Sequence, residues 1–177
     1  MGKKILILAG SPRKGGNSDI LCDEFARGAE ETGHQVQKIY VHTLHIGGCM
    51  ACYACRSTGV CVQKDGMAEA LEALITADVI VLATPVYFYS MDGQLKTLID
   101  RTLPRYTEIQ DKDFYFIATA AAGKRAMERT MDALRGFTDC LPGAKCKGQI
   151  YGSGVYQKGE VRDTPAMAEA YQAGKHA

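Results

Sequence analysis

Short apolar runs alternate with longer amphipathic stretches along the 177 residues of the chain. The runs at 3–9 and 79–83 are almost continuously apolar, which is typical of β-strands that are covered on both faces. The other predicted strands are residues 35–41, 114–119 and 146–152. Apolar residues at helical spacing predict helices at about 18–32, 93–102, 124–139 and 165–174, and a further helix that begins at residue 65 or 66.

Strands and helices therefore alternate, and the strands recur at spacings of roughly 30–45 residues, the length of a βαβ unit. This order predicts an α/β fold in which helices cover both faces of a five-stranded parallel sheet. We expect a single domain over residues 1–177, with one cysteine-rich excursion at about 44–65 that has no sustained periodicity. In such sheets, ligands bind at the edge where the strands end.

The loop after the first strand, residues 10–18, has the sequence Gly-Ser-Pro-Arg-Lys-Gly-Gly-Asn-Ser. A strand, a tight loop and a helix start form an anion site, because free N–H groups and the helix dipole both favour negative charge. The loop lacks the Gly-Lys-Ser/Thr ending of an NTPase loop and the G-x-G-x-x-G pattern of dinucleotide-binding proteins. A monophosphate ligand fits better, as in the flavodoxin-like three-layer fold with strand order 2-1-3-4-5.

Two further loops follow predicted strands and would lie at the same edge of the sheet. Residues 84–90 form an aromatic loop, Thr-Pro-Val-Tyr-Phe-Tyr-Ser. Residues 120–123 form a loop of small residues, Ala-Ala-Ala-Gly. Because the carboxyl ends of parallel strands share one edge, the three loops predict a single site.

The composition bears on the classes of partner that the chain could bind, but it does not indicate a function. The chain has 46% hydrophobic residues, 23% charged residues and a formal net charge of +1, as in an ordinary globular protein. A charge so near zero gives no reason to expect nucleic acid or an anionic membrane as a partner. The first apolar run is too short for a membrane span or a secretion signal, so we expect a cytoplasmic protein.

Four of the seven cysteines, Cys49, Cys52, Cys55 and Cys61, are clustered in one short stretch. Their spacing resembles the cysteine run of bacterial ferredoxins, although the fourth cysteine is farther away and no proline follows it. A [4Fe–4S] cluster, a four-thiolate zinc site and a set of reduced thiols with a C-x-x-C redox pair all remain open. The scattered cysteines are predicted to be small buried or half-buried apolar residues: Cys22, Cys140 and Cys146.

Together these motifs resemble the NAD(P)H-dependent FMN reductase branch of the flavodoxin-like superfamily. The resemblance is carried by Gly-Ser-Pro-Arg at 10–13, Asn-Ser at 17–18, Ala-Thr-Pro-Val-Tyr at 83–87, Leu-Lys at 95–96 and Asp-Arg at 100–101. It extends from residue 3 to the last predicted helix. The four-cysteine stretch is similar to that of the iron–sulfur flavoproteins within this branch. The resemblance implies a homodimer or homotetramer with a flavin near a subunit interface.

The resemblance also implies FMN as the cofactor and assigns residues to it. The FMN phosphate would be held by Ser11, Arg13, Asn17 and Ser18. The ribityl chain and the isoalloxazine ring would be flanked by Pro85, Val86, Tyr87 and Phe88. The pyrimidine end would be approached by the loop that includes Thr119, Ala120 and Gly123. Physical chemistry supports the assignment, because a flat aromatic cofactor needs aromatic and apolar walls with a few fixed polar groups.

The function predicted first is that of an oxidoreductase. FMN would take a hydride from NAD(P)H, and electrons would pass to a small acceptor such as a flavin or quinone, or to an iron–sulfur centre. No general acid or base is assigned, because the flavin carries the chemistry. The alternative is a non-enzymatic carrier that relays electrons between redox proteins. A third hypothesis is a thiol or metal sensor that retains little FMN.

Overall fold

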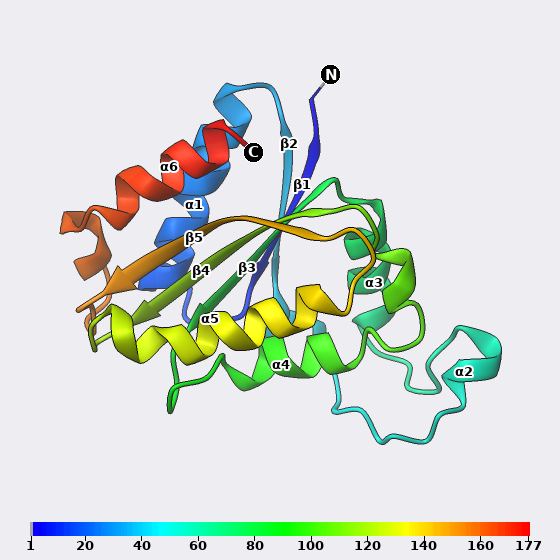
Figure 1. The fold of residues 1–177 in the computed structure, drawn as a ribbon. Coiled ribbons are helices and arrows are strands. Elements are labelled where there is room, and N and C mark those ends of the chain that lie inside the picture. Colours follow the sequence, from blue (N-terminus) through cyan, green and yellow to red (C-terminus); the bar gives the residue numbers. More distant parts are fainter. Residues whose placement is uncertain (1) are drawn as a thin grey trace.

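A computed structural model of the chain describes residues 2–177 and contains a twisted five-stranded sheet (Figure 1). All neighbouring strands are parallel, in the order β2-β1-β3-β4-β5. The strands are β1 (Lys4–Ala9), β2 (Gln35–Tyr40), β3 (Val79–Pro85), β4 (Asp113–Ala120) and β5 (Lys145–Ser153). The predicted fold class and strand order are therefore confirmed.

Helices cover both faces of the sheet, so the molecule has three layers (Figure 1). One face carries α1 (Asn17–Glu31) and α6 (Ala166–Lys175), and the other carries α3 (Met67–Thr76), α4 (Gly93–Asp100) and α5 (Lys124–Asp139). Along β1, Ile5 and Ile7 pack toward the first pair of helices, whereas Leu6 and Leu8 pack toward the other three. Because both faces are buried, the sequence of this strand is apolar without a break.

The structure adds short elements that the apolar pattern did not predict. The helix α2 (Cys55–Thr58) lies in the cysteine-rich excursion, which extends away from the sheet (Figure 1). Within residues 2–177, three 3₁₀ helices occupy Val41–Leu44, Tyr106–Glu108 and Glu160–Asp163. Elements of one turn have too few residues to show a periodicity. Among the helices of residues 2–177, none combines the length and the apolar character needed to cross a membrane.

The burial predicted for the scattered cysteines is confirmed once and wrong twice. Cys22 is fully buried on α1, and burial raises the pKa of its thiol. Cys140, which follows α5, and Cys146, on the edge strand β5, are both exposed. A helix end and an edge strand are covered on one side only, and a cysteine that stands alone has no periodic pattern to reveal this.

The helices α1 and α6 cross in close contact at two glycines. A Cβ atom at Gly28 would overlap the backbone of Tyr171, and a Cβ atom at Gly174 would overlap the backbone of Phe25. The absence of side chains at both positions lets the two backbones touch. This contact fixes the C-terminal helix on the sheet.

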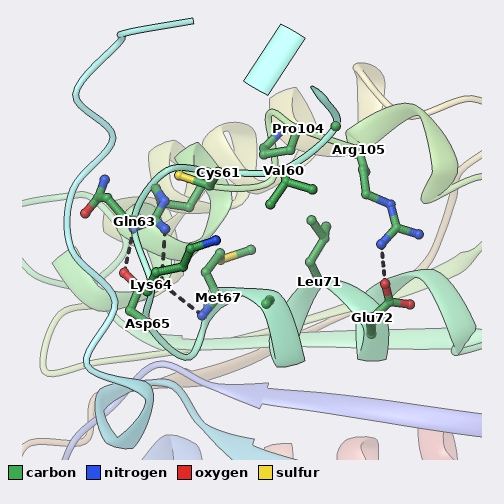
Figure 2. Close-up of a pocket in the computed structure, with 13 residues that line it drawn as sticks. Val60, Cys61, Gln63, Lys64, Asp65, Met67, Leu71, Glu72, Pro104 and Arg105 are labelled. Carbon is green, nitrogen blue, oxygen red and sulfur yellow. Dashed lines mark hydrogen bonds and ion pairs between the residues drawn. The ribbon is translucent and has the colours of Figure 1, made fainter. Parts of the chain in front are cut away.

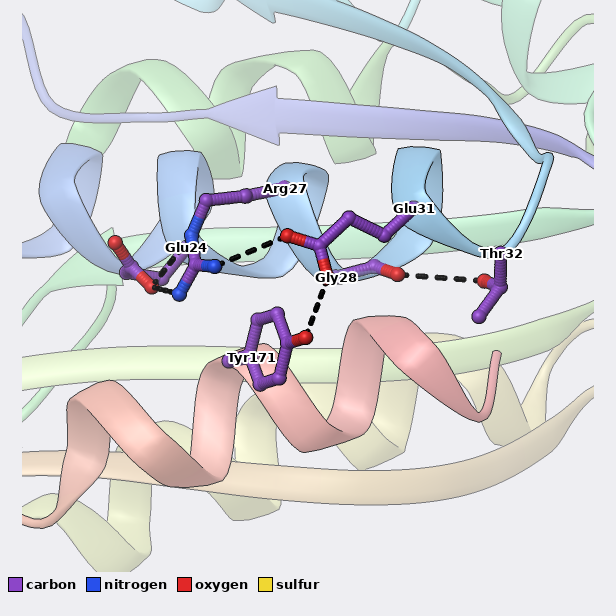
Figure 3. Close-up of polar contacts among 6 residues, drawn as sticks. All are labelled: Glu24, Arg27, Gly28, Glu31, Thr32 and Tyr171. Carbon is purple, nitrogen blue, oxygen red and sulfur yellow. Dashed lines mark hydrogen bonds and ion pairs between the residues drawn. The ribbon is translucent and has the colours of Figure 1, made fainter.

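Polar side chains surround the same crossing (Figure 3). The hydroxyl of Tyr171 donates to the carboxylate of Glu31. The guanidinium of Arg27 pairs with Glu24 at 2.7 Å and with Glu31 at 3.1 Å, and it lies 4.3 Å from the centre of the Tyr171 ring. These contacts are solvent-exposed, so we attribute the stability of the crossing mainly to close packing.

Candidate functional site

The loop between β1 and α1 ends at an open helix N-terminus. The N-cap residue is Gly16, which has no side chain to occupy the first N–H groups of α1. Ser11 and Ser18 are buried beside it, and Arg13 is exposed. N–H groups, hydroxyls and a guanidinium are the donors that bind a phosphate monoester. The loop therefore has the donor set of an anion site.

An acidic residue lies in the first turn of this helix, and its charge is balanced. Asp19 is buried, accepts a hydrogen bond from the backbone N–H of Gly15 at 2.6 Å, and lies 2.8 Å from the Lys38 ammonium. Burial by itself would lower the pKa of Lys38, but its hydrogen bonds to Asp19 and Asp23 outweigh burial and raise the pKa. The lysine therefore stays charged and neutralises the carboxylate beneath the loop.

The loop of residues 10–18, which we call the anion loop, lines one cleft of about 240 Å³ together with the aromatic loop and the small-residue loop. The residues assigned to FMN that line this cleft are Ser11, Arg13, Asn17, Ser18, Pro85, Val86, Tyr87, Thr119 and Ala120. Two assigned residues lie elsewhere. Phe88 is fully exposed at the tip of the aromatic loop, and Gly123 lines a neighbouring cleft.

A fourth segment reaches the cleft from the loop after β5. Val155 and Tyr156 line it, and the side chain of Asn17 holds this loop in place. The Asn17 amide donates to the carbonyl of Gln157 at 2.9 Å and accepts from the N–H of Gly159 at 3.0 Å. In this structure Asn17 therefore positions the fourth wall of the cleft. The glycines of the segment indicated a loop, but no pattern in the sequence indicated its partner.

The aromatic loop is a tight hairpin with a strained backbone. Tyr87 and Ser90 exchange backbone hydrogen bonds of 2.9 and 3.0 Å, and Phe88 and Tyr89 between them have φ angles of 49° and 64°. Two consecutive positive φ angles are typical of a type I′ hairpin turn, a conformation that favours glycine or asparagine. Large aromatic residues in this turn project from the rim of the cleft, and strain of this kind is common at functional sites.

Beneath the cleft, a buried carboxylate joins the aromatic loop to the anion loop. Asp92 accepts from the Thr84 hydroxyl at 2.7 Å and caps α4 by accepting from the N–H of Leu95 at 3.0 Å. The backbone of Gly10 lies so close that a Cβ atom there would overlap this carboxylate. Burial raises the pKa of Asp92, and the hydrogen bonds only partly oppose the effect. Sequence reasoning did not find this network.

The cysteine-rich excursion is held to the sheet by Arg101, which follows α4. Its side chain is buried, donates to the carbonyl of Gly47 at 2.6 Å, and forms a two-point ion pair with Asp65 at 2.8 and 3.0 Å. Burial by itself would raise the pKa of Asp65, but Arg101 and the N–H groups of Gly47 and Met67 lower it. One arginine therefore fixes both ends of the excursion.

The four clustered cysteines line one narrow cavity of about 20 Å³ beside Arg101. Cys55 is buried, Cys61 is half-buried, and Cys49 and Cys52 are exposed; within residues 2–177 none of the four forms a disulfide. Across residues 2–177, no three His, Cys, Asp or Glu side chains lie close enough to hold a single metal ion. The excursion thus gathers the thiols around one cavity without forming a compact set of ligands.

A larger cavity, of about 380 Å³, lies against the same excursion (Figure 2). Val60 and Leu71 supply part of its apolar lining, and the ion pair between Arg105 and Glu72 lies at one end. Cys61 lines this cavity as well as the narrow one. An apolar space therefore adjoins the clustered thiols.

Gly123 belongs to a second open cleft, of about 710 Å³, at the N-terminus of α5. Its lining consists of Tyr89, Gly123, Lys124, Arg125, Ala126 and Arg129, and we call it the basic cleft. It adjoins the first cleft, because the aromatic loop and the small-residue loop contribute residues to both.

A parallel sheet of order 2-1-3-4-5, with an anion loop after its first strand and an aromatic loop after its third, defines a flavodoxin-like protein. Residues 3–152 match the family model of the NADPH-dependent FMN reductases. The chain belongs to this family, which confirms the predicted relationship.

Relatives by sequence include iron–sulfur flavoproteins. The chain is 34% identical to an iron–sulfur flavoprotein of Methanosarcina thermophila over 134 residues, which are 74% of this chain and 70% of that protein. It is 38% identical to an iron–sulfur flavoprotein of Archaeoglobus fulgidus over 101 residues, which are 57% of this chain and 46% of that protein. The match thus spans less than half the length of the Archaeoglobus relative.

Solved structures with similar folds include two oxidoreductases. An NAD(P)H:quinone oxidoreductase from Methanothermobacter marburgensis has a TM-score of 0.76 at 16% identity, covering 99% of this chain and 96% of that chain. An FMN-dependent NADH-azoreductase from Bacillus anthracis in complex with FMN has a TM-score of 0.77 at 15% identity, covering 98% of each chain. At such low identities these likenesses establish the fold.

Proposed function

We propose that this chain is an FMN-dependent oxidoreductase that oxidises NAD(P)H and passes the electrons to a small-molecule or protein acceptor. Membership of the NADPH-dependent FMN reductase family supports both the cofactor and the donor. The observation that carries the proposal is the cleft of about 240 Å³, in which an open helix N-terminus faces two loops from neighbouring strands.

The residues of the cleft fit FMN in their chemistry. Ser11, Ser18, Arg13 and the first N–H groups of α1 would bind the phosphate, because they supply neutral and charged donors without a nearby unpaired carboxylate. Tyr87 would shield one part of the ring system from water. When bound, FMN supplies hydride acceptance from the nicotinamide and electron transfer to an acceptor. The chain's own contribution is to bind and orient the reactants.

We propose further that the cysteine-rich excursion holds a [4Fe–4S] cluster through Cys49, Cys52, Cys55 and Cys61. Two observations support this ligand set: the four thiols line one cavity, and the two relatives described above are named iron–sulfur flavoproteins. Arg101 lines the same cavity, so a buried cation would lie next to the cluster.

Analysis of cofactors and reduction by nucleotides on one sample tests the proposal. After anaerobic purification we expect one FMN and about four iron and four sulfide per chain, and FMN without iron or sulfide would refute the cluster. NADPH or NADH should then bleach the visible absorbance of the bound flavin under anaerobic conditions. Absence of FMN would refute the function. FMN that neither nucleotide reduces would favour an electron carrier between redox proteins instead.

Substitution of Arg13 tests the anion loop directly. Arg13→Ala should weaken FMN binding by about 1.5–3 kcal/mol, or roughly 10- to 150-fold in Kd, because a charge-assisted hydrogen bond to the phosphate is lost. Lys14→Ala is the matched control, since Lys14 lies outside the lining of the cleft and its ammonium lies 5.0 Å from the centre of the Tyr40 ring. Equal FMN affinities for the two variants would remove Arg13 from the site.

A further inference from the structure

The basic cleft carries more positive charge than the chain as a whole would suggest. The formal net charge of the molecule is +1, yet the cleft is lined by Lys124, Arg125 and Arg129 and by no acidic residue. None of the three takes part in an ion pair within the part of the chain that the structure describes. Three unpaired cations on one wall produce a local field that attracts a polyanion.

Neighbouring acidic side chains are engaged elsewhere. Glu128, on the same helix, lies on the side of Tyr151, with a carboxylate oxygen 3.4 Å from the Tyr151 hydroxyl, and does not line the cleft. Asp132, one turn further along, pairs with Arg135. The helix α5 is 16 residues long, has no acidic residue in its first turn and begins after Gly123, so its dipole adds to the positive field.

Two of the three basic side chains, those of Lys124 and Arg129, lie over aromatic rings. The Lys124 ammonium lies 4.3 Å from the centre of the Tyr151 ring, and the Arg129 guanidinium lies 5.6 Å from the centre of the Tyr89 ring. Such contacts orient a cation while leaving its hydrogen-bond donors free for a ligand. Tyr89 also lines the cleft and offers a flat face on which a base can stack.

The basic cleft adjoins, through two loops, the cleft of about 240 Å³ that we propose binds FMN, here called the flavin cleft. In the aromatic loop, Tyr87 lines the flavin cleft and Tyr89 lines the basic cleft. In the small-residue loop, Ala121 lines the flavin cleft and Gly123 lines the basic cleft. Two residues of chain span on the order of 7 Å, so an extended ligand can reach from one cleft into the other. A molecule that places one end against the flavin would therefore place its other end among these cations.

We propose that the basic cleft binds the adenosine 2′-phosphate of NADPH, with Arg125 and Arg129 as the residues that favour NADPH over NADH. This inference rests on the proposed function, because it names the nucleotide that the same site uses. A phosphate monoester presents several acceptor oxygens to guanidinium groups, whereas the 2′-hydroxyl of NADH presents neither charge nor a matching geometry.

Binding of 2′,5′-ADP and 5′-AMP to the FMN-loaded protein tests the proposal without relying on turnover. The wild-type chain should bind 2′,5′-ADP more tightly than 5′-AMP. The double variant R125Q/R129Q should bind 2′,5′-ADP about 10- to 100-fold more weakly and 5′-AMP nearly as before, because only the 2′-phosphate contacts are lost. KM for NADPH should rise by a similar factor, while KM for NADH changes by less than about threefold.

The control variant is Arg135→Gln, which removes a cation from the same helix but outside the cleft and should leave every one of these constants unchanged. Equal losses for NADPH and NADH, or unchanged 2′,5′-ADP binding in the double variant, would overturn the assignment. Failure of the proposed function has a different signature: neither nucleotide reduces the wild-type flavin, whereas 2′,5′-ADP binding still reports on the cleft.

Discussion

At the scale of single residues, the site depends on a close contact that only glycine permits. Gly10 directly follows the first strand and lies against the carboxylate of Asp92, which is buried and held by Thr84 and by the N-terminus of α4. Because the carboxylate is held by several hydrogen bonds, it cannot move aside without losing some of them. The glycine that opens the anion loop is therefore also the residue that lets the aromatic loop approach.

Gly10→Ala should lower the free energy of unfolding by about 1–3 kcal/mol, because the added methyl group displaces a fixed buried carboxylate. Gly93→Ala is the matched control: nothing lies within 4 Å of its Cβ position, and the change should stay within about 0.5 kcal/mol. Equilibrium denaturation of both variants measures the difference. Equal stabilities would mean that Asp92 relaxes freely, contrary to the network described above.

At the scale of elements, the crossing of α1 and α6 invites a comparison with a glycine inside α5. Gly174 faces the backbone of Phe25, whereas nothing lies within 4 Å of the Cβ position of Gly136. Both glycines lie in helices, so the same substitution has the same local effect on helix propensity. Packing alone distinguishes them.

Gly174→Ala should therefore destabilise the chain by about 1–3 kcal/mol, since the methyl group forces the two helices apart. Gly136→Ala should stabilise it by about 0.5–1 kcal/mol, because alanine loses less conformational entropy in a helix. Thermal unfolding of the two variants should give shifts of opposite sign. A stabilising shift for Gly174→Ala would show that the helices can separate at little cost.

Comparison of these elements with the sequence shows which features a pattern can reveal. The strands β1 and β3 were predictable because burial on both faces leaves an unbroken apolar run, and the anion loop because strand, glycine and helix start are consecutive. The contacts of Asn17 with the loop after β5 and of Gly10 with Asp92 join residues far apart in the chain. A single polar residue belongs to no periodic pattern, so the sequence does not indicate which distant residue it contacts.

At the scale of the whole molecule, one arginine couples the cysteine-rich excursion to the sheet. Arg101 is itself buried, and it contacts the excursion at Gly47 and at Asp65. Removal of Arg101 would leave the carbonyl and the carboxylate without their charged donor. The excursion extends away from the rest of the fold (Figure 1), so we expect few other contacts to replace this one.

Arg101→Met should lower the free energy of unfolding by about 2–4 kcal/mol and speed hydrogen exchange at residues 47–65, because a buried charge partner is lost. Arg105→Met is the control, because its pairs with Glu72 and Glu108 are exposed to solvent and should contribute little to stability. The pH dependence of stability gives a second test of the ion pair between Arg101 and Asp65. Because the pKa of Asp65 is lowered in the folded chain, the pair stabilises the wild-type fold at pH values above the ordinary carboxylate pKa. This stability is lost as the pH falls through the lowered pKa. The Arg101→Met variant should therefore lose less stability than wild type on acidification. If exchange at residues 47–65 stayed at the wild-type rate, the excursion would be held by contacts other than those of Arg101.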